Sequence, residues 1–136
     1  MARFYSILLV VVASLVVSCS KSKTTAEIAD EMSIEVLSLP TILKEVEAGK
    51  SVDSAAKQLQ SVADSIIVLA QQVEPGEYLT QEQRAAFEKK LRESQDETMY
   101  LLIGLSARPG DQVQLVEPIG NLGDALEFAS QVMKEP

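Results

Sequence analysis

Apolar residues recur at every third or fourth position in four segments of the chain, which is the period of an amphipathic helix. The segments cover residues 24–47, 52–73, 81–106 and 112–134, and none shows the alternation of a strand. The pattern therefore predicts an all-α fold. The apolar stripes, interrupted twice in the third segment by hydroxyl residues, are Ile28, Met32, Val36, Leu39, Leu43 and Val46; Ala55, Leu59, Val62, Ile66, Leu69 and Val73; Phe87, Leu91, Ser94, Thr98, Leu101 and Leu105; and Leu115, Ile119, Leu122, Leu126, Ala129 and Met133.

Each segment begins beside a side chain that can accept a hydrogen bond from the free amides of a first helical turn. These predicted N-caps are Thr24, Ser51, Thr80 and Asp111, and three of them have Glu or Gln three residues later, the spacing of a capping box. Glycine and proline mark the predicted stops that precede the later segments, because both residues end helices. The stops are Gly49, Pro75-Gly76 and Pro109-Gly110.

The connections between these helices are short, and short connections place consecutive helices antiparallel. The expected architecture is an up-down-up-down antiparallel four-helix bundle formed by residues 24–136. Pro40 and Pro118 lie inside the first and last segments, where a proline removes a backbone hydrogen bond. We expect each segment to kink or split there, near Leu39 and near Glu117. Two alternatives stay open: simple curvature of the bundle, or a local opening that admits a ligand or partner.

A separate apolar run precedes the helical segments. Residues 1–18 carry one basic residue, Arg3, and no acidic residue, and their apolar stretch has the length of a signal-peptide core. At its end, Leu15-Val16-Val17-Ser18-Cys19 resembles the lipobox of bacterial lipoproteins. The resemblance implies cleavage before Cys19, diacylglycerol on the Cys19 thiol and acylation of the new amino terminus. Several acyl chains hold a protein on a membrane where one chain is marginal.

By the same resemblance, residues 1–18 are a lipoprotein signal peptide and residues 19–23 are the lipidated cysteine with a polar tether. The residue after the cysteine is Ser20 rather than the aspartate associated with inner-membrane retention in enteric bacteria. This implies the bacterial cell envelope, with delivery to the outer membrane and a bundle that faces the periplasm. The alternatives are an uncleaved signal anchor and an ordinary leader cysteine in a secreted protein.

Composition limits the chemistry. The chain has no histidine and one cysteine, so it lacks the histidines of di-iron and haem bundles and cannot form an internal disulfide or a multi-cysteine metal site. We expect no catalytic residue, no cofactor and no metal. Its formal charge of −8, which becomes −9 when Arg3 leaves with the leader, argues against a nucleic-acid partner.

Carboxylates cluster within single helical turns, and we expect them to form solvated faces with nearby lysines and arginines as partners. Weak divalent-cation binding is the alternative. The two clusters are Glu27, Asp30 and Glu31, and Glu93, Asp96 and Glu97.

Ser94 and Thr98 interrupt the apolar stripe of the third segment, and we expect each hydroxyl to bond back to the carbonyl one turn earlier. The alternative is a polar patch inside a small pocket. Tyr100 and Phe128 lie beside the main stripes and are expected to widen the core.

Tyr78 lies in the second connection, close to Glu74 and Glu77. An aromatic side chain on an acidic loop is a candidate partner contact; alternatively, the tyrosine folds over the end of the bundle.

Together, these observations favour a lipid-anchored acidic helical-bundle lipoprotein that acts by protein binding or structural support. The lipids on Cys19 would hold it at a membrane, and its charge would favour a basic protein partner. One alternative is an inhibitor or immunity-type lipoprotein that blocks a basic periplasmic enzyme or toxin. Another is a small-molecule carrier with a pocket beside Pro40 and Pro118. The oligomeric state is left open.

Overall fold

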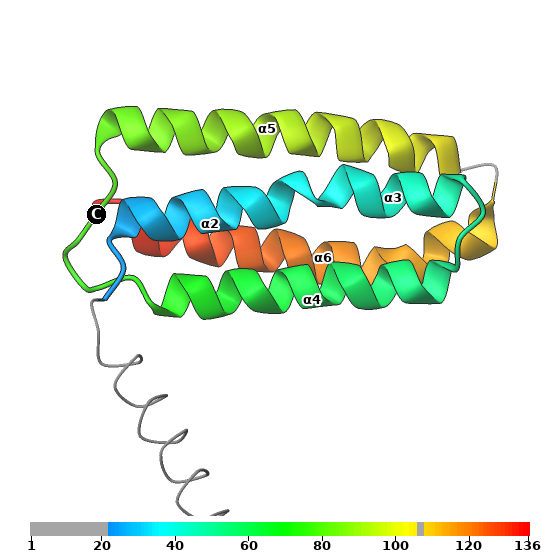
Figure 1. The fold of residues 1–136 in the computed structure, drawn as a ribbon, viewed down its shortest axis with the longest axis horizontal. Helices are drawn as coiled ribbons and strands as arrows, with labels where there is room; N and C mark the ends of the chain where they lie inside the picture. The colour runs from blue at the N-terminus through cyan, green and yellow to red at the C-terminus, as the bar shows by residue number, and fades with distance from the viewer. Residues whose placement is uncertain (1–21, 106–107) are drawn as a thin grey trace, which may run out of the picture.

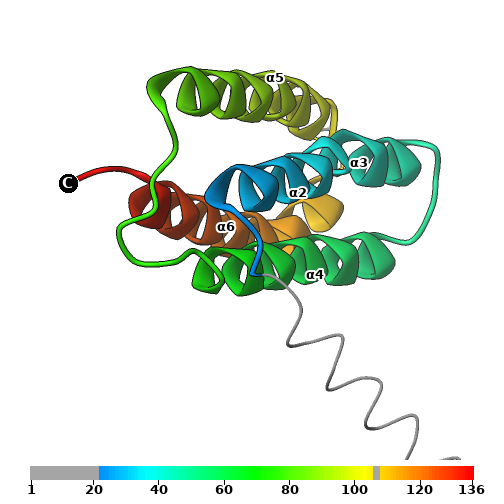
Figure 2. The same ribbon diagram turned by 60° about the vertical axis from the view of Figure 1, so that its left-hand side comes forward.

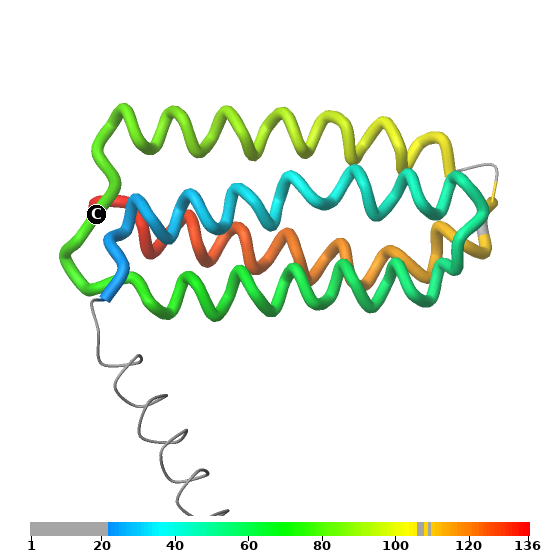
Figure 3. The backbone as a smooth tube through the Cα atoms, in the orientation of Figure 1, coloured from blue at the N-terminus to red at the C-terminus, as the bar shows by residue number. Residues whose placement is uncertain are grey.

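The computed structural model describes residues 22–105 and 108–136, and every regular element in these residues is a helix. The helices are α2 (Thr25–Leu37), α3 (Leu39–Glu47), α4 (Val52–Gln71), α5 (Gln81–Gly104) and α6 (Pro109–Met133) (Figure 1). Because α2 and α3 follow one path, the described chain forms four packed helical rods (Figure 3). The all-helical class is confirmed. The predicted signal peptide and Cys19 lie outside the described residues.

Three of the four predicted helix starts are confirmed. The Thr24 and Thr80 hydroxyls each accept a hydrogen bond of 3.2 Å from the backbone amide three residues later, in Glu27 and Gln83. The side chains of Glu27 and Gln83 accept in return from the cap amides at 2.8 and 3.0 Å, which completes both capping boxes. Ser51 accepts from the Ser54 amide at 3.4 Å.

The predicted start of the last helix is wrong. Helix α6 begins at Pro109 with Arg108 at the N-cap position, so Asp111 lies in the first turn and caps nothing. A proline is tolerated at the start of a helix, where its missing N–H would have had no helical partner. Pro109-Gly110 is therefore the beginning of α6 rather than a stop. The Asp111 carboxylate lies 3.9 Å from the Arg108 guanidinium.

The two internal prolines have different effects. At Pro40 the first segment splits into α2 and α3 beside Leu39, as predicted. At Pro118 the helix continues, so the alternative of a split near Glu117 is wrong. Pro118 removes the regular partner of the Gln114 carbonyl, and Gln114 is exposed, so water can bond to that group. The corresponding carbonyl at Pro40 belongs to Val36, which is buried.

Helices α4 and α6 have the most extensive contact in the bundle, although α5 lies between them in sequence. Five buried alanines allow the two backbones to approach closely; they are Ala55, Ala63 and Ala70 on α4, and Ala125 and Ala129 on α6. The α2–α3 rod packs against α4 on one side and α5 on the other (Figure 2). The packing order of the rods therefore differs from their order in the chain.

The predicted stripes form the core, with most of their members buried and Leu91, Ile119, Leu126 and Val73 half-buried. The prediction for the two aromatic side chains beside the stripes is wrong. Tyr100 is 76% exposed on the outer side of α5, and Phe128 is 39% exposed. Both lie beside the buried stripe of their helix rather than in it.

Candidate binding surfaces

The connection between α4 and α5, residues 72–80, runs across one end of the bundle and is held there by its backbone. The Thr25 hydroxyl, at the start of α2, donates a hydrogen bond of 2.8 Å to the Glu77 carbonyl. The Leu79 amide donates to the Met133 carbonyl at the end of α6, at 3.2 Å. Leu79 is buried. Two helix ends therefore fix the path of this loop.

All three predicted contact residues lie in this loop, and all three are exposed. Glu74, Glu77 and Tyr78 project from a backbone that is fixed at Glu77 and Leu79. The residue that covers the end of the bundle is Leu79, which the sequence analysis did not single out. Its only signal was an apolar residue directly before the helix cap Thr80. We call Glu74, Glu77 and Tyr78 the acidic loop.

The acidic loop shares its end of the bundle with the start of the folded chain. Helix α2 begins at Thr25, whose side chain contacts the loop, and Figure 1 shows the chain entering the bundle at this end. The opposite end carries the α3–α4 turn and Arg108, whose guanidinium donates to the Val46 carbonyl at 3.2 Å. The two ends of the bundle are thus chemically different.

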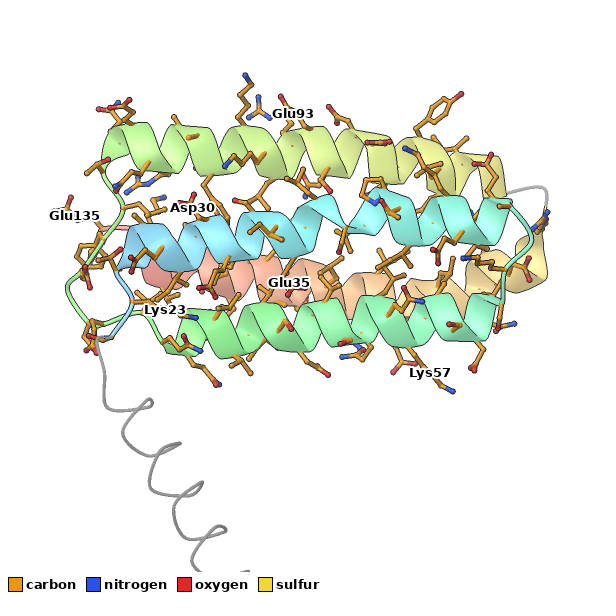
Figure 4. The ribbon with its side chains drawn as sticks, viewed as in Figure 1. Lys23, Asp30, Glu35, Lys57, Glu93 and Glu135 are labelled. Atoms are coloured by element: carbon orange, nitrogen blue, oxygen red, sulfur yellow. The ribbon has the colours of Figure 1, made fainter. Side chains whose placement is uncertain are left out.

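The carboxylate clusters lie at the surface and take part in exposed ion pairs. Lys23 pairs with Glu31 at 2.8 Å, whereas Lys90 lies 4.0 Å from Asp30, across the gap between α5 and α2 (Figure 4). Exposed pairs of this kind contribute little stability. In the part of the chain that the structure describes, no group of His, Cys, Asp or Glu residues is arranged to hold a metal ion.

Ser94 is buried, but its hydroxyl does not bond back to its own helix. It donates a hydrogen bond of 2.7 Å to the Val36 carbonyl, across the interface between α5 and α2. This is the carbonyl that loses its regular partner because Pro40 has no N–H. The prediction of a bond within the helix is wrong for Ser94. The Thr98 hydroxyl is buried and has no hydrogen-bond partner among residues 22–105 and 108–136, so the same prediction is wrong for Thr98.

A groove of about 520 Å³ lies between α2 and α4 on the outside of the bundle. Its lining includes Glu31, Ile34 and Glu35 from α2, and Asp64, Ser65 and Val68 from α4. Ile34 is 70% exposed and Val68 54% exposed. This surface was not predicted from the sequence. The available signal was Ile34 itself, a large apolar residue two positions after the stripe residue Met32 and therefore on the opposite side of the helix.

No family match identifies the chain. No protein-family model matches it, and neither a curated protein nor a solved structure gives a significant match. None of the described helices is both long enough and apolar enough to span a membrane.

Proposed function

We propose that this protein is a lipid-anchored acidic helical-bundle lipoprotein of the bacterial cell envelope, which acts by binding a basic protein partner. The lipobox-like residues that end in Cys19 support the anchor, and the signal peptide that precedes them supports export. The Ser20 position favours the outer membrane, with the bundle in the periplasm. The finer topology we propose is the up-down-up-down bundle, supported by the positions of the loops at alternating ends.

The single observation that supports binding best is the acidic loop. Its backbone is hydrogen-bonded to Thr25 and Met133, so the loop that exposes Glu74, Glu77 and Tyr78 is held in a fixed position. A preorganised contact loses less conformational entropy when a partner binds. The two carboxylates favour a basic partner, and the tyrosine offers an apolar surface with a polar tip.

The anchor would also determine where binding occurs. A tether of residues 19–23 spans about 17 Å when fully extended. The end of the bundle that carries the acidic loop would then lie close to the bilayer surface. A partner would have to approach along the membrane or be part of it. We expect binding or structural support rather than catalysis.

The anchor is tested by Cys19→Ala in cells that express the full chain. The expected result is a protein that stays unprocessed or leaves the membrane fraction, because the thiol that would receive the lipid is gone. Fractionation and the mass of the mature protein measure this. A variant that is cleaved and membrane-held like the wild type would overturn the lipoprotein assignment.

Binding is tested by placing a photoreactive amino acid at position 78 and, as a control, at position 100, which is exposed on α5. Irradiation of intact membranes should crosslink a basic protein at position 78 and not at position 100, with less product at high salt. The same products from both positions, or no product at position 78, would contradict the role of the acidic loop. A captured periplasmic enzyme that loses activity when bound would favour the inhibitor alternative.

A further inference from the structure

The groove between α2 and α4 combines exposed apolar side chains with a negatively charged rim. Ile34 projects from α2 and Val68 from α4, and more than half of each side chain is exposed. Glu31, Glu35 and Asp64 line the same groove. Figure 4 shows Glu35 on the face where α2 and α4 lie side by side. Exposed apolar side chains next to carboxylates suit a partner that brings both apolar and basic groups.

Part of the negative charge at this rim has no neutralising partner within the described chain. Glu31 pairs with Lys23 at one end of the groove. Among residues 22–105 and 108–136, no lysine or arginine forms an ion pair with Glu35 or Asp64. Within the described residues, the Asp64 carboxylate accepts a hydrogen bond of 2.9 Å from the neutral amide of Gln60. The middle of the groove therefore favours a cation.

We propose that this groove is a docking site for a basic amphipathic helix of another protein. Along α4 the lining spans residues 61–69, which is about 12 Å and corresponds to two turns of an incoming helix. One apolar stripe of that helix would contact Ile34 and Val68, and lysines or arginines beside the stripe would meet Glu35 and Asp64. This is the helix-in-groove mode of recognition.

Charge distinguishes this occupant from the two nearest alternatives. A second copy of this chain would bring the same acidic rim and the same net negative charge to the contact. The chain's own leader, residues 1–18, has an apolar stretch but only one basic residue, so it cannot supply a basic stripe. The groove is separate from the acidic loop, and this inference does not depend on lipid attachment at Cys19.

The test uses the full chain in discs of zwitterionic lipid and a fluorescent peptide of eighteen residues. The peptide is alanine-based, with leucine at every third or fourth position and lysine on both sides of the leucine stripe. Two comparison peptides have glutamate in place of lysine, or the same composition in scrambled order. Binding is measured by anisotropy with empty discs as the blank. A short helix buries a small interface, so we expect micromolar affinity for the lysine peptide alone.

Two pairs of matched variants locate the site. Ile34→Gln with Val68→Gln should weaken binding at least tenfold, whereas Val113→Gln with Val116→Gln, at residues 71% and 64% exposed on α6, should leave it within twofold. Glu35→Gln with Asp64→Asn should weaken binding at least fivefold at low salt and much less at high salt. The control with the same charge change is Glu117→Gln with Asp124→Asn, both exposed on α6.

Several results would overturn the proposal. Equal losses in the groove and control variants would mean that the peptide responds only to net charge. Equal binding of the glutamate or scrambled peptide, or no binding above that of empty discs, would remove the basic helix as the occupant. Sedimentation of wild type as a dimer that Ile34→Gln with Val68→Gln dissociates would assign the groove to a second copy. Circular dichroism of each variant confirms that the helices remain folded.

Discussion

Removing the hydroxyl of Ser94 is expected to destabilise the bundle more than removing an equally buried hydroxyl elsewhere. Ser94 is 2% exposed and donates a hydrogen bond of 2.7 Å to the Val36 carbonyl. In a regular helix that carbonyl would accept from the amide at position 40, but Pro40 has none. That carbonyl also accepts from a backbone N–H at the end of α2, so Ser94→Ala removes the donor that joins α5 to α2 and leaves the backbone donor in place.

The expected loss in the free energy of unfolding is about 0.5–1.5 kcal/mol, the net contribution of one buried hydrogen bond, because a backbone N–H at the end of α2 still donates to the Val36 carbonyl. Ser33→Ala is the matched control. Ser33 is 3% exposed and donates at 2.8 Å to the Ala29 carbonyl in its own helix, where the Ser33 amide already bonds to that carbonyl. Its removal should cost well under 1 kcal/mol. Both substitutions gain the same helix propensity, so this gain cancels in the comparison.

A double-mutant cycle isolates the cause. Pro40→Ala restores an N–H at position 40, the regular helical donor to the Val36 carbonyl. Ser94→Ala should then lower the free energy of unfolding by about 0.5 kcal/mol less in the Pro40→Ala background than in the wild type. The cycle cancels the ring contacts that Pro40→Ala loses, because they are lost in both arms.

Urea unfolding of the full chain, followed by far-ultraviolet circular dichroism, measures these differences. With a slope of about 1.5 kcal/mol per molar urea, a loss of 1.5 kcal/mol moves the midpoint by about 1 M. The reasoning is refuted if Ser94→Ala costs no more than Ser33→Ala. It is also refuted if the cost of Ser94→Ala is the same with proline and with alanine at position 40.

Three further predictions use the same assay. Thr98→Val should raise the free energy of unfolding by about 1 kcal/mol, because it removes a buried hydroxyl that no described residue satisfies; an unchanged or lower midpoint would show that the hydroxyl has a partner. Ala63→Leu should cost about 1–3 kcal/mol by overpacking the side of α4 that faces its neighbours, whereas Ala85→Leu on the exposed surface should be nearly neutral. Thr80→Ala should lower the free energy of unfolding by about 1 kcal/mol because the α5 cap is lost, whereas Thr80→Ser should keep the cap and most of this stability. Equal losses in the two variants would argue against the cap.

The helices and most of their ends could be predicted because their causes are local. The caps at Thr24, Ser51 and Thr80 bond to amides three residues away, a distance that a short stretch of sequence already specifies. Gly49 ends α3 with a φ of 96°, a conformation that glycine adopts without strain, and its amide donates to the Val46 carbonyl at 2.9 Å. The wrong prediction for the start of α6 also has a local cause. Asp111 and Arg108 are close neighbours in the sequence, and either could have been the N-cap.

The candidate surfaces were predicted less completely. The exposure of Glu74, Glu77 and Tyr78 followed from their loop position, but the fixation of that loop depends on Thr25 and Met133, which lie far away in the sequence. The groove beside Ile34 required knowledge of which helix lies next to α2. Sequence periodicity identifies the buried side of a helix, but it does not identify the neighbour at its edge.

The amino-acid sequence alone determined the helical class, the core stripes and the local caps, because those features depend on residues one turn apart. The tertiary structure decided the effects of the two prolines. The carbonyl that loses its regular partner at Pro40 is buried and accepts an additional bond from Ser94, 58 positions further along the chain, whereas the carbonyl affected by Pro118 belongs to an exposed residue. It also decided that α4 packs most closely on α6. The physical reason is that burial and long-range hydrogen bonds depend on how the helices are placed in space, which the local pattern does not specify.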